Sequence, residues 1–319
     1  MTDVEDDTPP VLIIALGPTG SGKGSIPSKI STLLKKEKKK EDEYEFTNIL
    51  IDDLVENHKN YKQEVSKILE ELQKNHEAGS DPFSINNLRN KDILKKFNKA
   101  YFQTRKKVYC NEEKISCDKL DDNNLAEALN GGKNIVFEST GEYFPSWLFK
   151  VHKNQLNKHK YEIIVSYSVV GLCELIKRNF TRTQETIKKF LEDKHNKAPR
   201  LPDMNQDKFK GKVKRIIKTF KETVDKQKNI CTEQFTECAI RIVVFDNNTT
   251  DSSKMYDSKE NIQDNDNNND KVQKIINSYN ANVERCEREG KGKSKKSKKS
   301  KKSKKSKTRK NSRKTNRRR

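Results

Sequence analysis

The amino-acid sequence predicts an α/β domain built on a five-stranded parallel sheet with helices on both faces. Three observations lead to this prediction: five short apolar segments, helical patterns between them, and a change of composition near residue 248. Only 31% of the 319 residues are hydrophobic and 36% are charged. The core therefore has to be concentrated in those few apolar segments.

Each candidate strand is rich in β-branched residues and is bounded by glycine or polar residues, which is typical of buried strands. The five segments span residues 11–17, 46–52, 134–140, 161–171 and 239–246. More than a dozen residues separate consecutive segments, including a polar, helix-rich insert over about 54–131. Connections of that length join parallel strands through helices, so we expect one domain over residues 9–248.

The ends of the chain differ from this domain in composition. Residues 1–8 form an acidic N-terminal segment. Between residues 246 and 270, 13 of 25 residues are Asp or Asn, and such a composition buries too little apolar surface to order itself, so we predict a linker over 249–271. Residues 272–289 have the pattern of a short amphipathic helix.

A basic tail follows from residue 290 to 319, with 18 Lys or Arg and no acidic residue. The remaining 289 residues carry 50 basic and 47 acidic residues, a net charge of +3, so the tail holds most of the positive charge. Its low complexity predicts disorder. Such a tail would bind nucleic acid or another acidic surface without sequence specificity, or serve for solubility or nuclear import.

No segment predicts a membrane or secretory protein. The N-terminus "MTDVEDDTPP" lacks an apolar signal segment, and no apolar run approaches the roughly 20 residues that span a bilayer. The six cysteines include no C-x-x-C pair and no histidine at zinc-site spacing. These features predict an intracellular, cytoplasmic protein with reduced thiols, with nuclear import through the basic tail as an open alternative.

A phosphate-binding motif follows the first candidate strand. "GPTGSGKGS", residues 17–25, fits G-x-x-x-x-G-K between a strand and a helical pattern. Its glycines let backbone N–H groups approach phosphate oxygens, and Lys23 supplies a positive charge to the β- and γ-phosphates. We therefore expect ATP to bind to Gly17, Thr19, Gly20, Ser21, Gly22, Lys23, Gly24 and Ser25.

Gly24 departs from the usual motif, because a serine or threonine normally follows the lysine and offers its hydroxyl to Mg²⁺. Ser25 lies one residue further along, in an order that resembles the Lys-Gly-Thr of adenylate kinases. We predict that the Ser25 hydroxyl binds Mg²⁺ in place of the hydroxyl that Gly24 lacks.

Carboxylates follow the second and third candidate strands, where ligands of open α/β sheets bind. Asp52 and Asp53 end "ILIDD", and either could accept the proton of a substrate hydroxyl or cap the helix that we expect to start at Leu54. Glu138 and Thr140 end "FESTGEY". Glu138 could hold Mg²⁺ or contact the substrate.

Arginine is scarce before residue 290, yet three arginines follow the fourth strand. Arg178 and Arg182 lie four residues apart and share a helix face, and Arg200 lies in the loop "NKAPRLPD". Guanidinium groups at this place could cover the transferring phosphate as a lid over about 178–205, or the helix face could simply be solvated. We assign Arg182 to the substrate side.

In this order, "GPTGSGKGS", "ILIDDLVE", "FESTGEYF", "IKRNFTR…APRLPD" and "IVVFDNN" resemble the zeta-toxin group of P-loop kinases over about residues 11–248. The resemblance implies that Lys23 binds ATP phosphates and that Asp53, with Asp52 as the alternate, is the general base. It implies contact of the substrate with Asp52, Glu138 and Thr140. It also implies lid roles for Arg178 and Arg200, and places Asp246 and Asn247 near the adenine.

The expected activity is therefore transfer of the γ-phosphate of ATP, with Mg²⁺, to the hydroxyl of a small molecule. Bacterial members of the group phosphorylate UDP-N-acetylglucosamine, but Ser139 replaces the family's glycine and the insert carries no readable sugar-nucleotide signature. The sequence does not identify the molecule that accepts the phosphoryl group. Alternatives are a polynucleotide kinase or another nucleic-acid-directed P-loop enzyme, and a nucleotide-binding module tethered by its basic tail.

Overall fold

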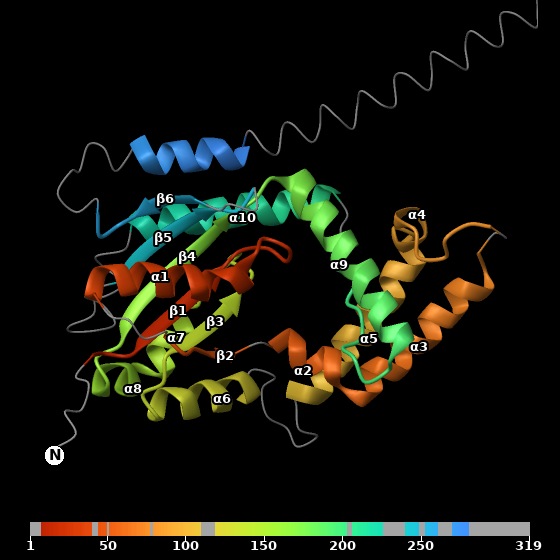
Figure 1. Cartoon of the computed structure of the whole chain (residues 1–319), viewed down its shortest axis with the longest axis horizontal. Helices are drawn as coiled ribbons and strands as arrows, with labels where there is room; N and C mark the ends of the chain where they lie inside the picture. Colours follow the sequence, from red (N-terminus) through yellow and green to blue (C-terminus); the bar gives the residue numbers. More distant parts are fainter. Residues whose placement is uncertain are drawn as a thin grey trace, which may run out of the picture.

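The structure is a computed structural model, and it describes residues 8–39, 44–49, 51–76, 79–109, 119–202, 206–225, 240–248, 253–260 and 270–280. Figure 1 shows a central sheet flanked by helices, with a group of helices beyond one end of the strands. The expectations for an acidic N-terminal segment and for a disordered tail over 290–319 fall outside the described residues, apart from Thr8.

Six strands form one sheet in the order β2-β3-β1-β4-β5-β6. The strands are β1 (Val11–Leu16), β2 (Thr47–Ile49), β3 (Ile135–Ser139), β4 (Glu162–Val169), β5 (Ile240–Asp246) and β6 (Ser253–Asp257). The five predicted strands are present and pair in parallel, as expected. The prediction of a purely parallel, five-stranded sheet was wrong, because β6 adds an antiparallel edge to β5.

β6 lies inside the segment that we expected to be a linker. Tyr256 and Asp257 of this strand are buried, at 2% and 1% exposure. Arg241 of β5 donates to Asp257 through both Nε (2.9 Å) and Nη2 (2.6 Å). A buried, doubly hydrogen-bonded ion pair fixes the strand at the edge, a local feature that the average composition of the Asp- and Asn-rich segment conceals.

The helices are α1 (Ile26–Lys38), α2 (Ile51–Asn57), α3 (Lys59–Lys74), α4 (Ile85–Leu88), α5 (Lys91–Tyr109), α6 (Lys119–Asn130), α7 (Ser146–Val151), α8 (Lys153–Lys158), α9 (Leu172–Glu192) and α10 (Gln206–Asp225). Alternate residues of β1 face opposite sides of the sheet. Val11, Ile13 and Ala15 pack against α1, whereas Leu12, Ile14 and Leu16 belong to the larger core that includes α9 and α10. The sheet is thus covered on both faces.

Helices α2 to α5 form a lobe beyond the carboxyl ends of the strands (Figure 1). The lobe holds most of the predicted insert over about 54–131, whose last helix, α6, packs beside β2 and α8. Within the lobe, Tyr61 of α3 packs edge to face on Tyr101 of α5 at 6.1 Å between ring centroids. α9 runs from the end of β4 to this lobe, so it joins the two parts of the molecule (Figure 1).

A helix over 270–280 packs on the core through Val272, Ile275 and Tyr279, all of which are buried. The Tyr279 hydroxyl donates to the carbonyl oxygen of Ser168 in β4 at 3.1 Å. We expected a helix over 272–289, and residues 281–289 lie outside the described ranges.

Cys173, in the first turn of α9, is disulfide-bonded. The expectation of reduced thiols is wrong for this cysteine, because spacing along the chain does not reveal which residues meet in space. None of the helices in the described part of the chain is long and apolar enough to cross a bilayer.

Candidate active site

The phosphate-binding loop between β1 and α1 depends on its glycines. Gly20 and Gly22 have φ angles of 83° and 84°, in the left-handed region that favours glycine. A Cβ atom at Gly20 would lie 2.6 Å from the side-chain nitrogen of Asn179, and one at Gly22 would lie 2.9 Å from that of Asn247. Any other residue at these positions would push these two asparagines away from the loop.

The same two asparagines hold the loop in shape. Asn179 of α9 donates to the carbonyl oxygen of Thr19 at 2.7 Å, and Asn247 donates to that of Ser21 at 2.9 Å. Both asparagines are buried, at 2% and 4% exposure. The C=O and N–H groups of a trans peptide point in opposite directions, so the N–H groups of Gly20 and Gly22 point away from the two asparagines.

Four N–H groups of the loop are available to a ligand. Among the described residues, none accepts a hydrogen bond from the N–H groups of Gly20, Gly22, Lys23 or Gly24. They lie at the start of the Lys23–Ser25 turn that leads into α1, where the helix dipole adds positive potential. Such a cluster of amide donors suits a phosphate chain, so the residues present fit the expected nucleotide.

Lys23 is nearly enclosed by this loop and by β3. Its Nζ donates to the carbonyl oxygen of Gly17 at 3.0 Å and lies 3.9 Å from Oε2 of Glu138. Burial lowers the pKa of Lys23, and the negative charges of Glu138 and Asp52 counteract part of that effect. Burial likewise raises the pKa of Glu138, which the Lys23 charge opposes. Each residue therefore helps the other to stay ionised in a poorly solvated place.

Asp52, in the first turn of α2, accepts hydrogen bonds from the Tyr101 hydroxyl and from the Arg200 guanidinium. Burial opposes its ionisation, but the Arg200 charge and both hydrogen bonds hold the pKa of Asp52 below its ordinary value. The charge of Asp52 also acts on Lys23. Asp52 is thus an ionised carboxylate that faces the phosphate-binding loop.

Asp53 faces another direction. Its Oδ2 atom accepts from Nζ of Lys197 at 2.5 Å, and both side chains are partly exposed. Successive residues of a helix point about 100° apart, so only one of two adjacent aspartates can face the loop. The structure brings Asp52 into the cluster with Lys23 and places Asp53 at its outer side.

Arg200 is held by three helices through the loop that carries it. The N–H group of Ala198 donates to the Glu56 carbonyl of α2 (2.9 Å), and the Tyr61 hydroxyl of α3 donates to the Pro199 carbonyl (3.0 Å). Thr183 of α9 donates to the carbonyl oxygen of Arg200 itself at 3.0 Å. The guanidinium lies over the Tyr101 ring, with Cζ 4.3 Å from the ring centroid, so Arg200 is preorganised rather than free to sample many rotamers.

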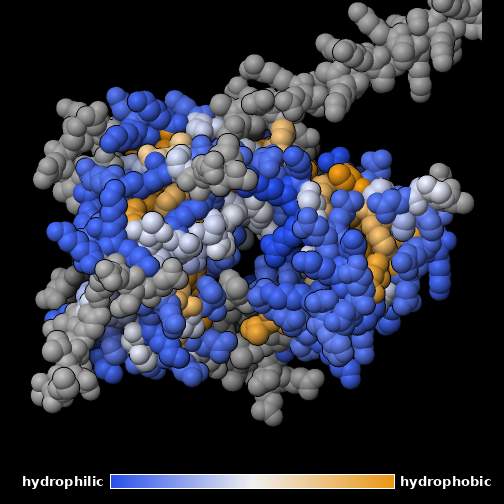
Figure 2. Space-filling view, in the orientation of Figure 1, coloured by the Kyte–Doolittle hydropathy of each residue, from blue (hydrophilic) through white to orange (hydrophobic). Residues whose placement is uncertain are grey.

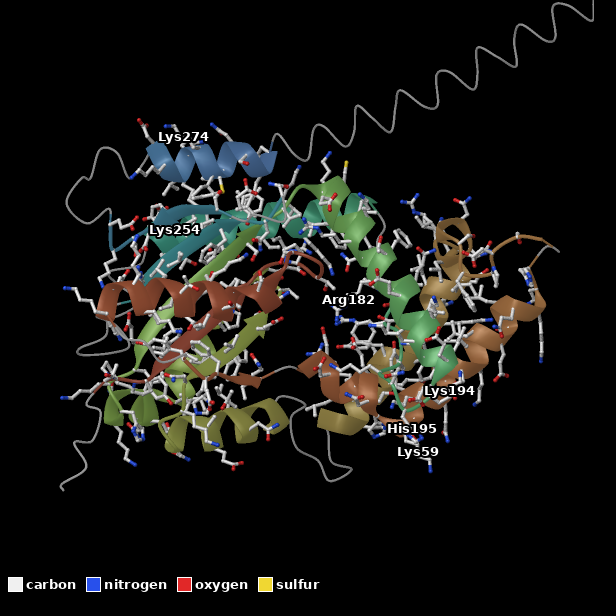
Figure 3. All side chains as sticks on the ribbon, in the orientation of Figure 1. Lys59, Arg182, Lys194, His195, Lys254 and Lys274 are labelled. Carbon is white, nitrogen blue, oxygen red and sulfur yellow. The ribbon has the colours of Figure 1, made fainter. Side chains whose placement is uncertain are left out.

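The two arginines of α9 have different surroundings. Arg182 lines a small cavity together with Thr19, Asp52 and Arg200, and Figure 3 shows it between α9 and the α2 side of the site. Arg178 instead pairs with Glu174, with Nε 2.9 Å from Oε1, and donates to the Asn248 carbonyl at 3.4 Å. The structure therefore brings Arg182 and Arg200 together and leaves Arg178 on the side of β5.

A larger pocket of about 390 Å³ opens beside the loop, in the hollow between the sheet and the helical lobe (Figure 2). Thr140, which we predicted to contact the substrate, is one of its lining residues. Aromatic and positively charged side chains make up much of the remaining lining of the pocket. Its lining includes Pro18, Thr19, Tyr101, Phe102, Thr140, Glu142, Arg200, Lys208, Phe209 and Lys212.

The remaining predicted residues lie near the loop. Ser25 is exposed, and its hydroxyl donates to the Gly22 carbonyl at 2.8 Å. A Cβ atom at Gly24 would meet no atom within 4 Å, so nothing in the packing excludes a hydroxyl-bearing residue there. Ser21 is fully buried beneath the loop, and Asp246 accepts from the N–H group of Asn248 at 2.9 Å.

Among the described residues, no group of three or more His, Cys, Asp or Glu side chains could hold a metal ion. Ser25 and Glu138, the predicted Mg²⁺ ligands, each offer the oxygen donor that this ion prefers beside nucleotide phosphates. The amide of Asn247, which we predicted to lie near the adenine, donates to Ser21 and Ser168 and accepts from Lys29.

Sequence reasoning missed three residues of the site: Asn179, Tyr101 and Glu56. Each lies on a helix, at a position where the residue type alone gives no sign of function. Of the three, only Asn179 gave a sign of its role in the sequence. Asparagine is unfavourable in the middle of a helix unless its side chain has a partner.

No protein-family model matches the sequence, and no curated protein matches it. Among solved structures, the chain is similar to one from the PezAT chromosomal toxin–antitoxin system of Streptococcus pneumoniae. Identity is 15% over 80% of this chain and 74% of that one, with a TM-score of 0.40. A candidate kinase from Chloroflexus aurantiacus is 14% identical over 61% of this chain and 84% of that one, with a TM-score of 0.26.

With both TM-scores below 0.5, neither likeness is evidence for an activity, and the function has to be inferred from the site residues themselves.

Proposed function

We propose that this chain is an ATP-dependent kinase that transfers the γ-phosphate to a hydroxyl group of a small molecule. One observation carries the proposal: Lys23, Glu138, Asp52 and Arg200 converge in front of a glycine loop with free N–H donors. This cluster combines positive groups for phosphate oxygens with a carboxylate that can accept a proton, which is what phosphoryl transfer needs.

In the proposed reaction the loop N–H groups and Lys23 hold the phosphate chain of ATP. Mg²⁺, held by Ser25 and Glu138 together with the phosphates, would supply positive charge to the phosphate oxygens. Arg200 and Arg182 approach the γ-phosphate from the opposite side, where they balance the negative charge of the transition state.

We assign the role of general base to Asp52 and not to Asp53. Asp52 accepts hydrogen bonds from Tyr101 and Arg200 inside the cluster, whereas Asp53 pairs with Lys197 at the outside. For transfer, Arg200 has to exchange the Asp52 carboxylate for the γ-phosphate, which leaves an oxygen of Asp52 available to the attacking hydroxyl. The oxygen of that hydroxyl then forms the new bond to phosphorus, ADP leaves, and Asp52 takes the proton.

The acceptor would occupy the 390 Å³ pocket, which has the size of a site for a small organic molecule. Its cations Arg200, Lys208 and Lys212 outnumber its one lining carboxylate, Glu142, so the pocket favours an acceptor that carries negative charge. The exposed ring of Phe102 offers an apolar surface on the same side.

The proposal can be tested by incubation of the purified protein with Mg²⁺, γ-labelled ATP and a panel of acceptors. The panel holds UDP-sugars, nucleosides, nucleotides, neutral sugars and 5′-hydroxyl oligonucleotides. We expect label on an anionic small molecule. Label on an oligonucleotide would support a nucleic-acid-directed kinase instead. ATP binding without transfer to any acceptor or to water would contradict the kinase proposal.

A further inference from the structure

Glu56 is a buried carboxylate that the proposed mechanism does not use. It lies one helical turn after Asp52 on α2 and is 5% exposed. Among the described residues, none makes a hydrogen bond or an ion pair with its side chain. A carboxylate rarely stays buried without a partner, since the loss of hydration is costly, so this position calls for an explanation.

The Glu56 side chain borders a cavity of about 30 Å³ that also reaches the phosphate-binding loop at Thr19. Arg182 borders the same cavity from α9 and, among the described residues, has no side-chain partner either. Figure 3 shows Arg182 on the side of α9 that faces α2. The cavity is large enough for a water molecule that bridges the two side chains.

Arg182 would otherwise be a poor ligand for phosphate. A long side chain without a partner samples many rotamers, and fixing it on the phosphate costs conformational entropy. Arg200, by contrast, is already fixed by Asp52 and the Tyr101 ring. Glu56 lies one turn after Asp52 on α2. From there its carboxylate can fix the Arg182 side chain, as Asp52 fixes that of Arg200.

We propose that Glu56 is a positioning residue, whose carboxylate holds Arg182 across the cavity and directs its guanidinium toward the γ-phosphate. The inference rests on the proposed function, because it assigns Arg182 to the same phosphate. Glu56 would then determine how strongly the site distinguishes ATP from ADP.

The charges around Glu56 make this role depend on pH. Arg182 of α9 and Arg200 of the following loop favour its ionisation, and Asp52 and Asp53 of α2 oppose it. The Tyr61 hydroxyl of α3 also lies close enough for its own ionisation to be opposed by Glu56. Burial dominates and raises the pKa of Glu56 to about 7. Glu56 should therefore hold Arg182 above pH 7 and release it below.

The test is a binding titration of the full chain with Mg²⁺ and either ATPγS or ADP, between pH 6 and pH 8.5. For the wild type we expect the affinity for ATPγS to rise about tenfold across pH 7, since one charge-assisted contact is gained, while the affinity for ADP stays level. Glu56→Gln should lose this rise and equal the wild type at pH 6. Glu64→Gln, an exposed carboxylate of α3, is the matched control and should behave as the wild type.

A rise that persists in Glu56→Gln would overturn the inference, and so would an equal loss of affinity at every pH, since that is the mark of a structural role. Arg182→Ala should remove the rise as well, and the double variant should be no worse than Arg182→Ala alone. Single-turnover assays with γ-labelled ATP separate the two proposals. If the wild type neither transfers nor releases phosphate, the kinase proposal fails, while the titration still decides the role of Glu56.

Discussion

Arg200 and Asp52 are hydrogen-bonded to each other between the loop after α9 and the first turn of α2. The pair joins the proposed lid arginine to the proposed base. In this state the guanidinium neutralises the carboxylate and keeps it ionised. Binding of ATP offers the guanidinium a more highly charged partner, so nucleotide binding itself would make the base available.

Arg200→Ala should therefore do more than slow the reaction. We expect transfer to fall about a thousandfold, as for other arginines that stabilise the transferred phosphate. Because Arg200 is the main charge that lowers the pKa of Asp52, the acid limb of the pH–rate profile should move to higher pH. Arg178→Ala should cost far less, since Arg178 pairs with Glu174. An equal loss in both variants would contradict the assignment, and initial rates between pH 4 and pH 8 provide the measurement.

Lys23→Ala should weaken ATP binding about 10- to 100-fold, the worth of one charge-assisted hydrogen bond to phosphate. Lys23 is an enclosed ammonium whose pKa is lowered by burial, so its removal should not destabilise the fold. Calorimetric titration with ATP and a thermal melt give the two readouts. Lys36→Ala, on the exposed side of α1, is the control. Unchanged ATP affinity in Lys23→Ala would count against the loop as the nucleotide site.

Glu56→Gln should make folding stability less dependent on pH. The folded-state pKa of Glu56 is raised to about 7, so the folded chain holds its proton between pH 4.5 and 7 while the unfolded chain loses it. Ionisation of Glu56 therefore destabilises the fold as the pH rises, by about 3 kcal/mol once the pH exceeds 7. Urea unfolding at pH 5 and pH 8 should show that the variant loses less stability than the wild type over this interval. Equal losses would show that Glu56 is not buried as described.

Asp257→Ala should destabilise the fold by about 3 kcal/mol, because it leaves the buried guanidinium of Arg241 with Glu37 as its one acidic partner among the described residues. The pKa of Asp257 is lowered by Arg241, so the contribution of the pair is present above the ordinary aspartate range and is lost as the pH falls through the folded-state pKa. Denaturant unfolding at pH 7 measures the loss. Glu260→Ala, which removes an exposed partner of Lys254, should cost under about 1 kcal/mol. Equal small effects would indicate that β6 is not integral to the sheet.

The five parallel strands and the phosphate-binding loop could be predicted because each has a local signature. β1, for example, is an uninterrupted apolar run followed at once by the glycine loop. β6 could not be predicted, because it is stabilised by the ion pair between Asp257 and Arg241 of the neighbouring strand, and composition does not reveal this contact. The sequence left both Asp52 and Asp53 as candidates for the base, because the choice depends on the rotation of α2, which begins at Ile51 and not at Leu54.

The arginines illustrate the same limit. The sequence pointed to a group of arginines after β4, but the surroundings of Arg178 and Arg182 depend on which turn of α9 lies beside the loop. Glu56 and Tyr101 belong to the helical lobe, whose packing against α9 brings them to the site. Residues that a site recruits through tertiary packing leave little trace in the local pattern.

The most direct test of the proposed mechanism compares Asp52→Asn with Asp53→Asn in the transfer of labelled γ-phosphate, with ATP affinity measured in parallel. We predict that Asp52→Asn loses at least about a hundredfold in rate, as expected for removal of a general base, and still binds ATP. Asp53→Asn should stay within about threefold of the wild type, because its loss removes only a partly exposed ion pair. Full activity in Asp52→Asn, or a larger loss in Asp53→Asn, would contradict the assignment of the base and with it the proposed mechanism.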